Sequence, residues 1–235
     1  MPVKRYMPTP ESKMLMDVVR EYCDEQMRPK VDAMEATGEF PLEVFREIGE
    51  LGLLSLAYPE KFGGGGQPYE VYLQVVEEIA SAWMSVAVGV SVHSLTCNPI
   101  YAFGTHHQQE EFLHGMLDGS TLGAYCLSEA EAGSDVAAIS TWAERDGEDY
   151  VLNGTKAWIS HAGHASFYTT FARTSGHGSR GLSCFHIPAG TPGMSFPPPE
   201  RKMGLDCDTV GQVVFDDCRI PASQRIGREG QGMSI

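Results

Sequence analysis

The stretch Tyr125–Asp135, which reads YCLSEAEAGSD, stands just after the point where the spacing of apolar residues changes from helical to strand-like. Its first residues predict a strand that delivers Ser128 at its end. Small residues at Ala132-Gly133 then allow the backbone to approach another group closely, and the short polar side chains of Ser134-Asp135 follow. Such a turn suits a planar polar ligand that is held by backbone N–H groups and hydroxyls.

A second segment further along the chain, Trp158-Ile159-Ser160, completes this pattern. Alternation along a strand predicts that Trp158 and Ser160 lie on the same face. An aromatic plate beside a hydroxyl can stack on a flavin ring and anchor it. The alternative is a tryptophan of a β-core with an incidental serine, and the residues by themselves favour neither reading.

Before residue 121 the apolar residues recur at helical spacing. Pro41 suits the first position of one of the predicted helices. Residues 86–95 are apolar nearly all round, which favours a helix buried between others. The predicted apolar faces are Leu15, Val18, Val19 and Tyr22; Val44, Phe45, Ile48 and Leu51; Tyr72, Val75, Val76, Ile79 and Trp83; and Phe112, Leu113 and Met116, before Gly119.

After residue 121 the apolar residues alternate instead. Asp146-Gly147 and Asn153-Gly154 are both signals for hairpin turns, and Gly176-His177-Gly178 marks a further turn. The predicted strands cover residues 139–143, 150–152, 155–160, 167–171, 182–187 and 210–215. Short strands at this turn spacing indicate an antiparallel barrel or sandwich.

The sequence therefore predicts an α+β multidomain fold. An N-terminal all-α helical domain covers residues 1–121, and a middle antiparallel β-barrel or sandwich domain covers residues 122–226. Residues 227–235 are rich in glycine and are expected to connect to a C-terminal helical domain that is missing from the chain.

The composition is that of a soluble globular protein, with 42% hydrophobic and 20% charged residues among 235. A net charge of −14 argues against a nucleic acid or an anionic membrane as partner. Six scattered cysteines indicate reduced thiols. Residues 1–5 contain no apolar run of the signal-peptide kind, and the apolar run 86–92 is too short for a bilayer, so a cytoplasmic location is expected.

Other candidate sites are weaker. Gly63–Gly66 lacks the strand and the Lys-Ser/Thr pair of a phosphate loop, which favours an ordinary loop. His161 and His164 have no third ligand in register, so no metal is expected. Glu129 and Glu131 could form a carboxylate pair for acid–base chemistry, although a structural or solvated role is the better interpretation.

Taken together, the two segments closely resemble the two flavin-binding signatures of the acyl-CoA dehydrogenase family. Other motifs agree in order along nearly the whole chain, with one departure: Ala130 stands where the family usually has proline. The agreeing motifs are Pro59-Glu60-Lys61-Phe62-Gly63-Gly64, Glu77-Glu78-Ile79-Ala80, Phe103-Gly104-Thr105, Arg201-Lys202-Met203-Gly204 and Phe215-Asp216-Asp217-Cys218-Arg219-Ile220-Pro221.

The resemblance implies FAD as cofactor and a role for each motif position. Main-chain donors at Leu127 and Ser128 would serve the pyrimidine edge of the flavin, which Tyr125 would also line. Gly133 and Ser134 would lie near the pyrophosphate, and Ser134 also near the acyl-CoA substrate. Trp158 would pack on the isoalloxazine, and the Ser160 hydroxyl would reach toward N5. The implied cofactor-binding residues are Tyr125, Cys126, Leu127, Ser128, Glu129, Ala130, Glu131, Ala132, Gly133, Ser134, Trp158, Ile159 and Ser160.

The resemblance further implies α,β-dehydrogenation of an acyl-CoA thioester, with electrons passing to an electron-transfer flavoprotein and a homotetrameric assembly. The family's catalytic base belongs to its third domain, so no catalytic residue is assigned here and the chain alone is not expected to turn over. Two rivals remain: an acyl-CoA oxidase or flavin monooxygenase of the same fold, and a non-catalytic remnant that binds flavin or acyl-CoA.

Overall fold

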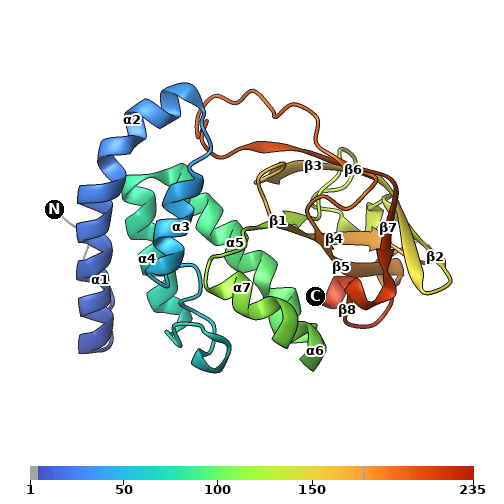
Figure 1. Ribbon diagram of the computed structural model, residues 1–235, viewed down its shortest axis with the longest axis horizontal. Coiled ribbons are helices and arrows are strands. Elements are labelled where there is room, and N and C mark those ends of the chain that lie inside the picture. Colours follow the sequence, from blue (N-terminus) through green and yellow to red (C-terminus); the bar gives the residue numbers. More distant parts are fainter. Residues whose placement is uncertain (1–4, 177) are drawn as a thin grey trace. The chain divides into compact units, whose positions relative to one another are not determined.

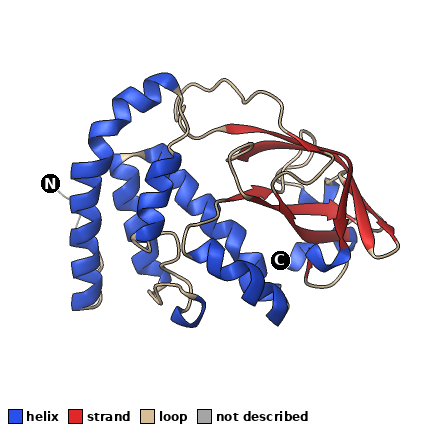
Figure 2. Cartoon of the chain, viewed as in Figure 1, coloured by secondary structure: helices blue, strands red, loops and turns tan. Residues whose placement is uncertain are grey.

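The structure, a computed structural model, describes residues 5–176 and 178–235, in which helices precede strands (Figure 1; Figure 2). A helical unit comprises residues 5–94, His114–Ser120 and Arg201–Asp208. A sheet unit comprises Leu95–Leu113, Thr121–Glu200 and Thr209–Ile235. The predicted fold class, helical and then β, is confirmed, whereas the domain boundaries at 121 and 226 stay predictions. Residues 1–4 and His177, and with it part of the turn expected at 176–178, lie outside the described residues.

The first helix begins at a well-formed cap. The Thr9 hydroxyl accepts a hydrogen bond from the Ser12 N–H at 3.1 Å, which satisfies a donor that the helix itself leaves free. The apolar face differs from the predicted one, because Val18 is 50% exposed while Met16 is buried. The α-helices of the described residues are α1 (Pro10–Tyr22), α2 (Arg28–Thr37), α3 (Leu42–Glu50), α4 (Tyr69–Ala82), α5 (Met84–Phe103), α6 (His106–Gln108) and α7 (His114–Leu117). The residues of α5 from Leu95 on, and all of α6, belong to the sheet unit.

A π-helical turn, Cys23–Met27, joins α1 to α2 without a break. It carries the buried stripe of α1 onward, since Cys23 and Met27 are fully buried in line with Met16 and Val19. The sequence did not predict α2, which has no buried residue and therefore no apolar face to reveal it.

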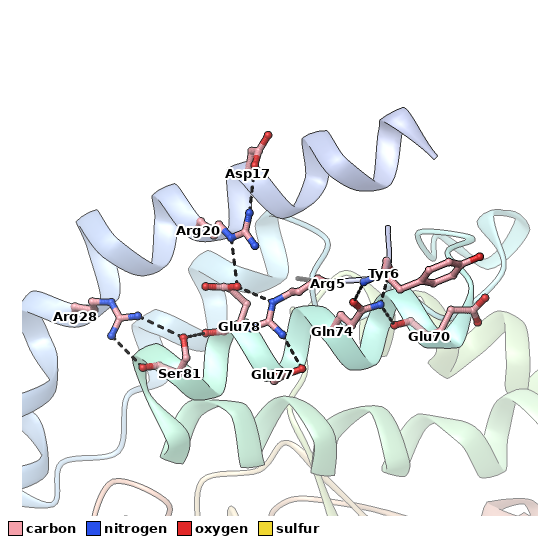
Figure 3. Close-up of polar contacts among 10 residues, drawn as sticks. All are labelled: Arg5, Tyr6, Asp17, Arg20, Arg28, Glu70, Gln74, Glu77, Glu78 and Ser81. Atoms are coloured by element: carbon pink, nitrogen blue, oxygen red, sulfur yellow. Dashed lines mark hydrogen bonds and ion pairs between the residues drawn. The ribbon is translucent and has the colours of Figure 1, made fainter. Parts of the chain in front are cut away.

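Polar contacts on α4 hold the N-terminal segment and α1 in place (Figure 3). The Glu78 carboxylate accepts hydrogen bonds from Arg5 Nε at 2.8 Å and from Arg20 Nε at 3.4 Å. Further along the same helix, the Ser81 carbonyl accepts from Arg28 at 3.0 Å. Glu78 is thus the common anchor for two segments that come earlier in the chain.

Helix α5 is the long apolar helix that residues 86–95 predict. By length and composition α5 could cross a membrane, and half of its most apolar stretch is buried within the chain. Its buried His93 shares a hydrogen bond of 2.7 Å with the Met116 carbonyl of α7.

The segment Arg201–Asp208, here called the strap, belongs to the helical unit although sheet segments precede and follow it. Glu35 of α2 holds it, because the Cys207 N–H donates to Glu35 Oε2 at 3.3 Å. The other carboxylate oxygen of Glu35 accepts from Trp83 Nε1 at 2.7 Å and from the Ser85 hydroxyl.

The sheet unit contains one eight-stranded sheet in the order β6-β7-β3-β2-β4-β5-β8, with β1 paired to β4. The sheet is not closed, and it is mixed, because β4 pairs in parallel with both β1 and β2. The expected antiparallel barrel or sandwich is therefore an open mixed sheet. The strands are β1 (Gly123–Cys126), β2 (Trp142–Asp146), β3 (Asp149–Ser160), β4 (Phe167–Arg173), β5 (Leu182–Pro188), β6 (Met194–Ser195), β7 (Val210–Pro221) and β8 (Arg225–Ile226).

One of the two predicted hairpin turns is confirmed and the other is wrong. Asp146-Gly147 leads into the β2–β3 hairpin, with Gly147 at φ 63°. Asn153-Gly154 instead lies inside β3 at an irregularity in its pairing with β7. Glycine is needed there for packing, since a Cβ at Gly154 would lie 2.6–2.8 Å from Thr141.

Candidate functional site

The turn at the centre of the first signature closes on itself. Glu129 and Ala132 exchange backbone hydrogen bonds of 2.8 and 3.2 Å. Ala132 is buried, while the following residues, Gly133 and Ser134, are exposed. A Cβ built on Gly133 would meet no atom within 4 Å, and its backbone does not require glycine. The main chain at Gly133 is therefore open to solvent and accessible to a ligand.

Beneath this turn lies a buried ion pair. Lys156 Nζ is 2.8 Å from Glu129 Oε1, and the two side chains are 0% and 6% exposed. Burial raises the pKa of Glu129, but the charge and hydrogen bond of Lys156, together with Thr141 and Ser140, lower it to about 2. Glu129 is thus held as a carboxylate, which makes it a weak base.

Trp158 stands in an unusual backbone conformation. Two residues, Ala157 and Trp158, face one residue of β7 between the pairs Lys156–Val213 and Ile159–Gly211, which is a β-bulge. Trp158 has φ 57°, rare for a bulky residue and costing about 1–3 kcal/mol where it occurs. The residue as a whole is 58% exposed.

The two signature segments lie side by side. The Ala157 N–H donates to the Ser128 carbonyl at 2.9 Å, and Lys156 Nζ donates to the Leu127 carbonyl at 3.0 Å. The structure therefore brings together the two segments that the sequence singled out. Lys156 was missed by the sequence reasoning, although it stands two residues before Trp158.

The remaining signature side chains divide by their burial. Cys126 and Ile159 belong to the core of the sheet, so a ligand on the surface would meet only their main chain. Tyr125 is half-buried against Phe171, with ring centroids 5.3 Å apart, and burial raises its pKa to about 12. Ser128 and Ser160 are half-buried, while Ala130 and Glu131 are exposed.

The weaker candidates from the sequence have structural roles here. His161 Nδ1 lies 2.8 Å from the Gly123 carbonyl, within the sheet unit. Gly64 packs against Tyr58, whose carbonyl oxygen would lie 2.2 Å from an added Cβ. Within residues 5–176 and 178–235, no group of three or more His, Cys, Asp or Glu side chains could hold a metal ion.

The exposed part of this site fits a flavin nucleotide by its chemistry. A large aromatic face at Trp158, held in a strained backbone, is available for stacking. Open space beside Gly133 admits close approach of a polar group to the main chain, with the Ser134 hydroxyl next to it. The fit does not depend on any metal.

Two family descriptions match the chain: "Acyl-CoA dehydrogenase, N-terminal domain" over residues 9–120 and "Acyl-CoA dehydrogenase, middle domain" over residues 124–218. The mitochondrial isobutyryl-CoA dehydrogenase of Dictyostelium discoideum is 35% identical over 97% of this chain and 55% of its own length.

Solved structures agree with these matches. Butyryl-CoA dehydrogenase from Megasphaera elsdenii superposes with a TM-score of 0.93 at 32% identity, over 98% of this chain and 62% of that one. A glutaryl-CoA dehydrogenase from Mycobacterium smegmatis, in complex with FADH2, gives 0.88 at 29% identity, over 95% and 57%. The chain thus spans little more than half the length of these proteins. With both domains matched in order and the fold shared, the chain belongs to the acyl-CoA dehydrogenase family.

Proposed function

We propose that this chain carries the flavin-binding part of an enzyme that dehydrogenates an acyl-CoA thioester between its α and β carbons. The observation that carries the proposal is the exposed, strained Trp158 on a segment that is hydrogen-bonded to the first signature at Leu127 and Ser128. Family membership supports the cofactor, since a relative of the same fold is in complex with FADH2. When bound, FAD supplies the acceptor for the hydride that leaves the β carbon.

The residues of this chain would bind and orient rather than move the α-proton. The main chain at Leu127 and Ser128 would donate to the pyrimidine edge, and Ser134 would lie between pyrophosphate and acyl-CoA. The Ser160 hydroxyl would donate to the reduced ring, which favours electron transfer onto it. Glu129 is unsuited to be the base, because its carboxylate is buried and paired to Lys156.

The partners are part of the same proposal. Membership of the family favours an acyl-CoA as substrate, an electron-transfer flavoprotein as electron acceptor and a homotetramer as assembly.

Titration of the apo-protein with FAD, followed by quenching of flavin fluorescence, tests the proposal. Trp158→Ala should raise the Kd about tenfold, because it removes an aromatic face worth about 0.5–1.5 kcal/mol beyond the area it buries. Trp142→Ala is the matched control, since Trp142 is also an exposed tryptophan of this sheet. Equal Kd values for the two variants would refute the assignment of Trp158.

Gly133→Ala tests the open space. A Cβ there meets no atom of the chain, so the variant should melt at the temperature of the parent protein. It should nevertheless bind FAD more weakly, because the added methyl group occupies the space that a ligand needs. Gly204→Ala provides the control, as Gly204 is equally unconfined, and it should change neither property. Unaltered FAD binding by Gly133→Ala would show that this space is not used.

A further inference from the structure

Lys156 connects the two signature segments from below. Its Nζ donates to the Leu127 carbonyl at 3.0 Å and to Glu129 Oε1 at 2.8 Å, both on the first segment. Lys156 itself belongs to β3, two residues before Trp158 of the second segment. A single, fully buried ammonium group therefore sets the spacing between the two segments.

Glu129 extends this connection to a third stretch of chain. Its Oε1 also accepts from the Thr141 N–H at 2.9 Å, and its Oε2 accepts from both the N–H and the hydroxyl of Ser140 at 2.7 Å. The backbone of Glu129 meanwhile closes the turn with Ala132. The carboxylate thus fixes where the exposed turn begins and where the chain re-enters the sheet.

A second buried cation holds the far end of the same stretch. Arg173 is 4% exposed, and its guanidinium donates to the carbonyls of Ala137 at 2.7 Å and Ile139 at 3.0 Å. The exposed residues Gly133–Asp135 lie between these two anchors. Buried charged side chains therefore hold both ends of the stretch, while Gly133–Asp135 between them stay exposed.

Removing one partner of this ion pair would leave a buried charge unpaired, whereas replacing both partners avoids that cost. Buried pairs can often be replaced by neutral side chains of similar size at little cost, because the desolvation of both charges offsets their attraction. What neutral side chains do not reproduce is the set of directed hydrogen bonds that fix the peptide groups at Leu127 and Glu129. The effect of the pair should therefore appear in the geometry of the site.

We propose that Glu129 and Lys156 are positioning residues that preset the main chain of the two signature segments for flavin binding. The inference rests on the proposed function, which supplies the ligand. Both side chains are buried, so the pair would act through the Leu127 carbonyl and the neighbouring Ser128–Ala157 hydrogen bond.

The test is the double variant Glu129→Gln/Lys156→Met, in which both charges are removed and side-chain volume is roughly kept. Its apo-protein should melt within about 5 °C of the parent protein, because no buried charge is left unpaired. Its Kd for FAD should rise about tenfold or more, and the visible absorption bands of the bound flavin should shift. A purely structural role would change the melting temperature and leave the spectrum of the bound flavin unchanged.

The matched control is Arg219→Met/Asp146→Asn, which removes the ion pair of 2.7 Å between β7 and β2 of the same sheet, together with the pair of 3.2 Å between Arg219 and Asp149. Both of its side chains are exposed, so neither melting nor FAD binding should change. Parent protein that binds no FAD would refute the proposed function and this inference with it. Parent protein that binds FAD, with an unchanged Kd and spectrum in the Glu129/Lys156 double variant, would refute the inference alone.

If the double variant does not fold, Ser140→Ala decides the matter. It removes one hydroxyl bond to Glu129 from an exposed position and keeps the ion pair. We expect a Kd for FAD about threefold higher with the melting temperature nearly unchanged. Equal Kd values in Ser140→Ala and the parent protein would overturn the inference.

Discussion

Glu129→Gln should destabilise the protein in a way that depends on pH. In the folded chain the pKa of Glu129 is lowered from its ordinary 4.5 to about 2; burial opposes this, and Lys156, Thr141 and Ser140 outweigh it. At about 1.4 kcal/mol per pH unit, the difference corresponds to about 3 kcal/mol of stability. This stabilisation is fully present above pH 4.5 and is lost as the pH falls toward 2, because protonation removes the paired charge.

Urea unfolding followed by circular dichroism, repeated from about pH 7 down to about pH 2.5, measures the effect. The parent protein should be more stable than Glu129→Gln by about 3 kcal/mol at neutral pH, and the two should converge in acid, where a protonated glutamate resembles glutamine. Glu131→Gln, an exposed neighbour on the same turn, should differ from the parent protein by less than about 0.5 kcal/mol throughout. A constant difference between parent and Glu129→Gln across the pH range would refute the reasoning.

Three further outcomes are expected. Gly154→Ala should destabilise the sheet unit by about 1–3 kcal/mol, because its Cβ would overlap Thr141; unchanged urea unfolding would contradict this. Ser160→Ala should lower the potential of bound flavin by about 30–65 mV, the equivalent of a lost hydrogen bond to a charged ring, and redox titration measures it. The 235-residue chain, mixed anaerobically with FAD and a panel of acyl-CoAs, should leave the oxidised flavin band unbleached, since Glu129 is committed to Lys156; rapid bleaching would point to Glu131 or Asp135 as a base.

Helices with a clear apolar stripe could be predicted from the sequence, and those without one could not. The faces at Val44, Phe45 and Ile48 and at Tyr72, Val75 and Ile79 are buried as expected. Helix α2 was missed because nothing in it is buried. In α1 the helix itself was predicted correctly, but its buried face was not. Leu15, Val18 and Tyr22 form one apolar stripe at helical spacing, and Met16, Val19 and Cys23 form another. The structure buries the second stripe, and spacing alone does not distinguish the two.

The site was predictable as two segments but not as a connected structure. Simple alternation places Lys156 on the same face as Trp158, which would make both exposed. The bulge at Ala157-Trp158 adds one residue to the strand and so reverses which face the following side chains point to. Lys156 is therefore buried and Trp158 is exposed. A bulge depends on which strand pairs with which, and that information is tertiary. For the same reason Asn153-Gly154 has the composition of a turn and yet lies within a strand.

The strap, Arg201–Asp208, affects how this pair of units can be inherited or exchanged between proteins. Glu35 holds it by a bond to Cys207, and these two residues are far apart in the sequence. A recombination event that crosses over near residue 121 would therefore combine a strap from one parent with a carboxylate from the other. Chimeras of related chains should tolerate such a crossover when both parents carry a carboxylate at the position of Glu35 on α2. Where one parent lacks it, the Cys207 N–H of the strap loses its hydrogen-bond acceptor. The strap and Glu35 must therefore be exchanged together, although they are far apart in the sequence.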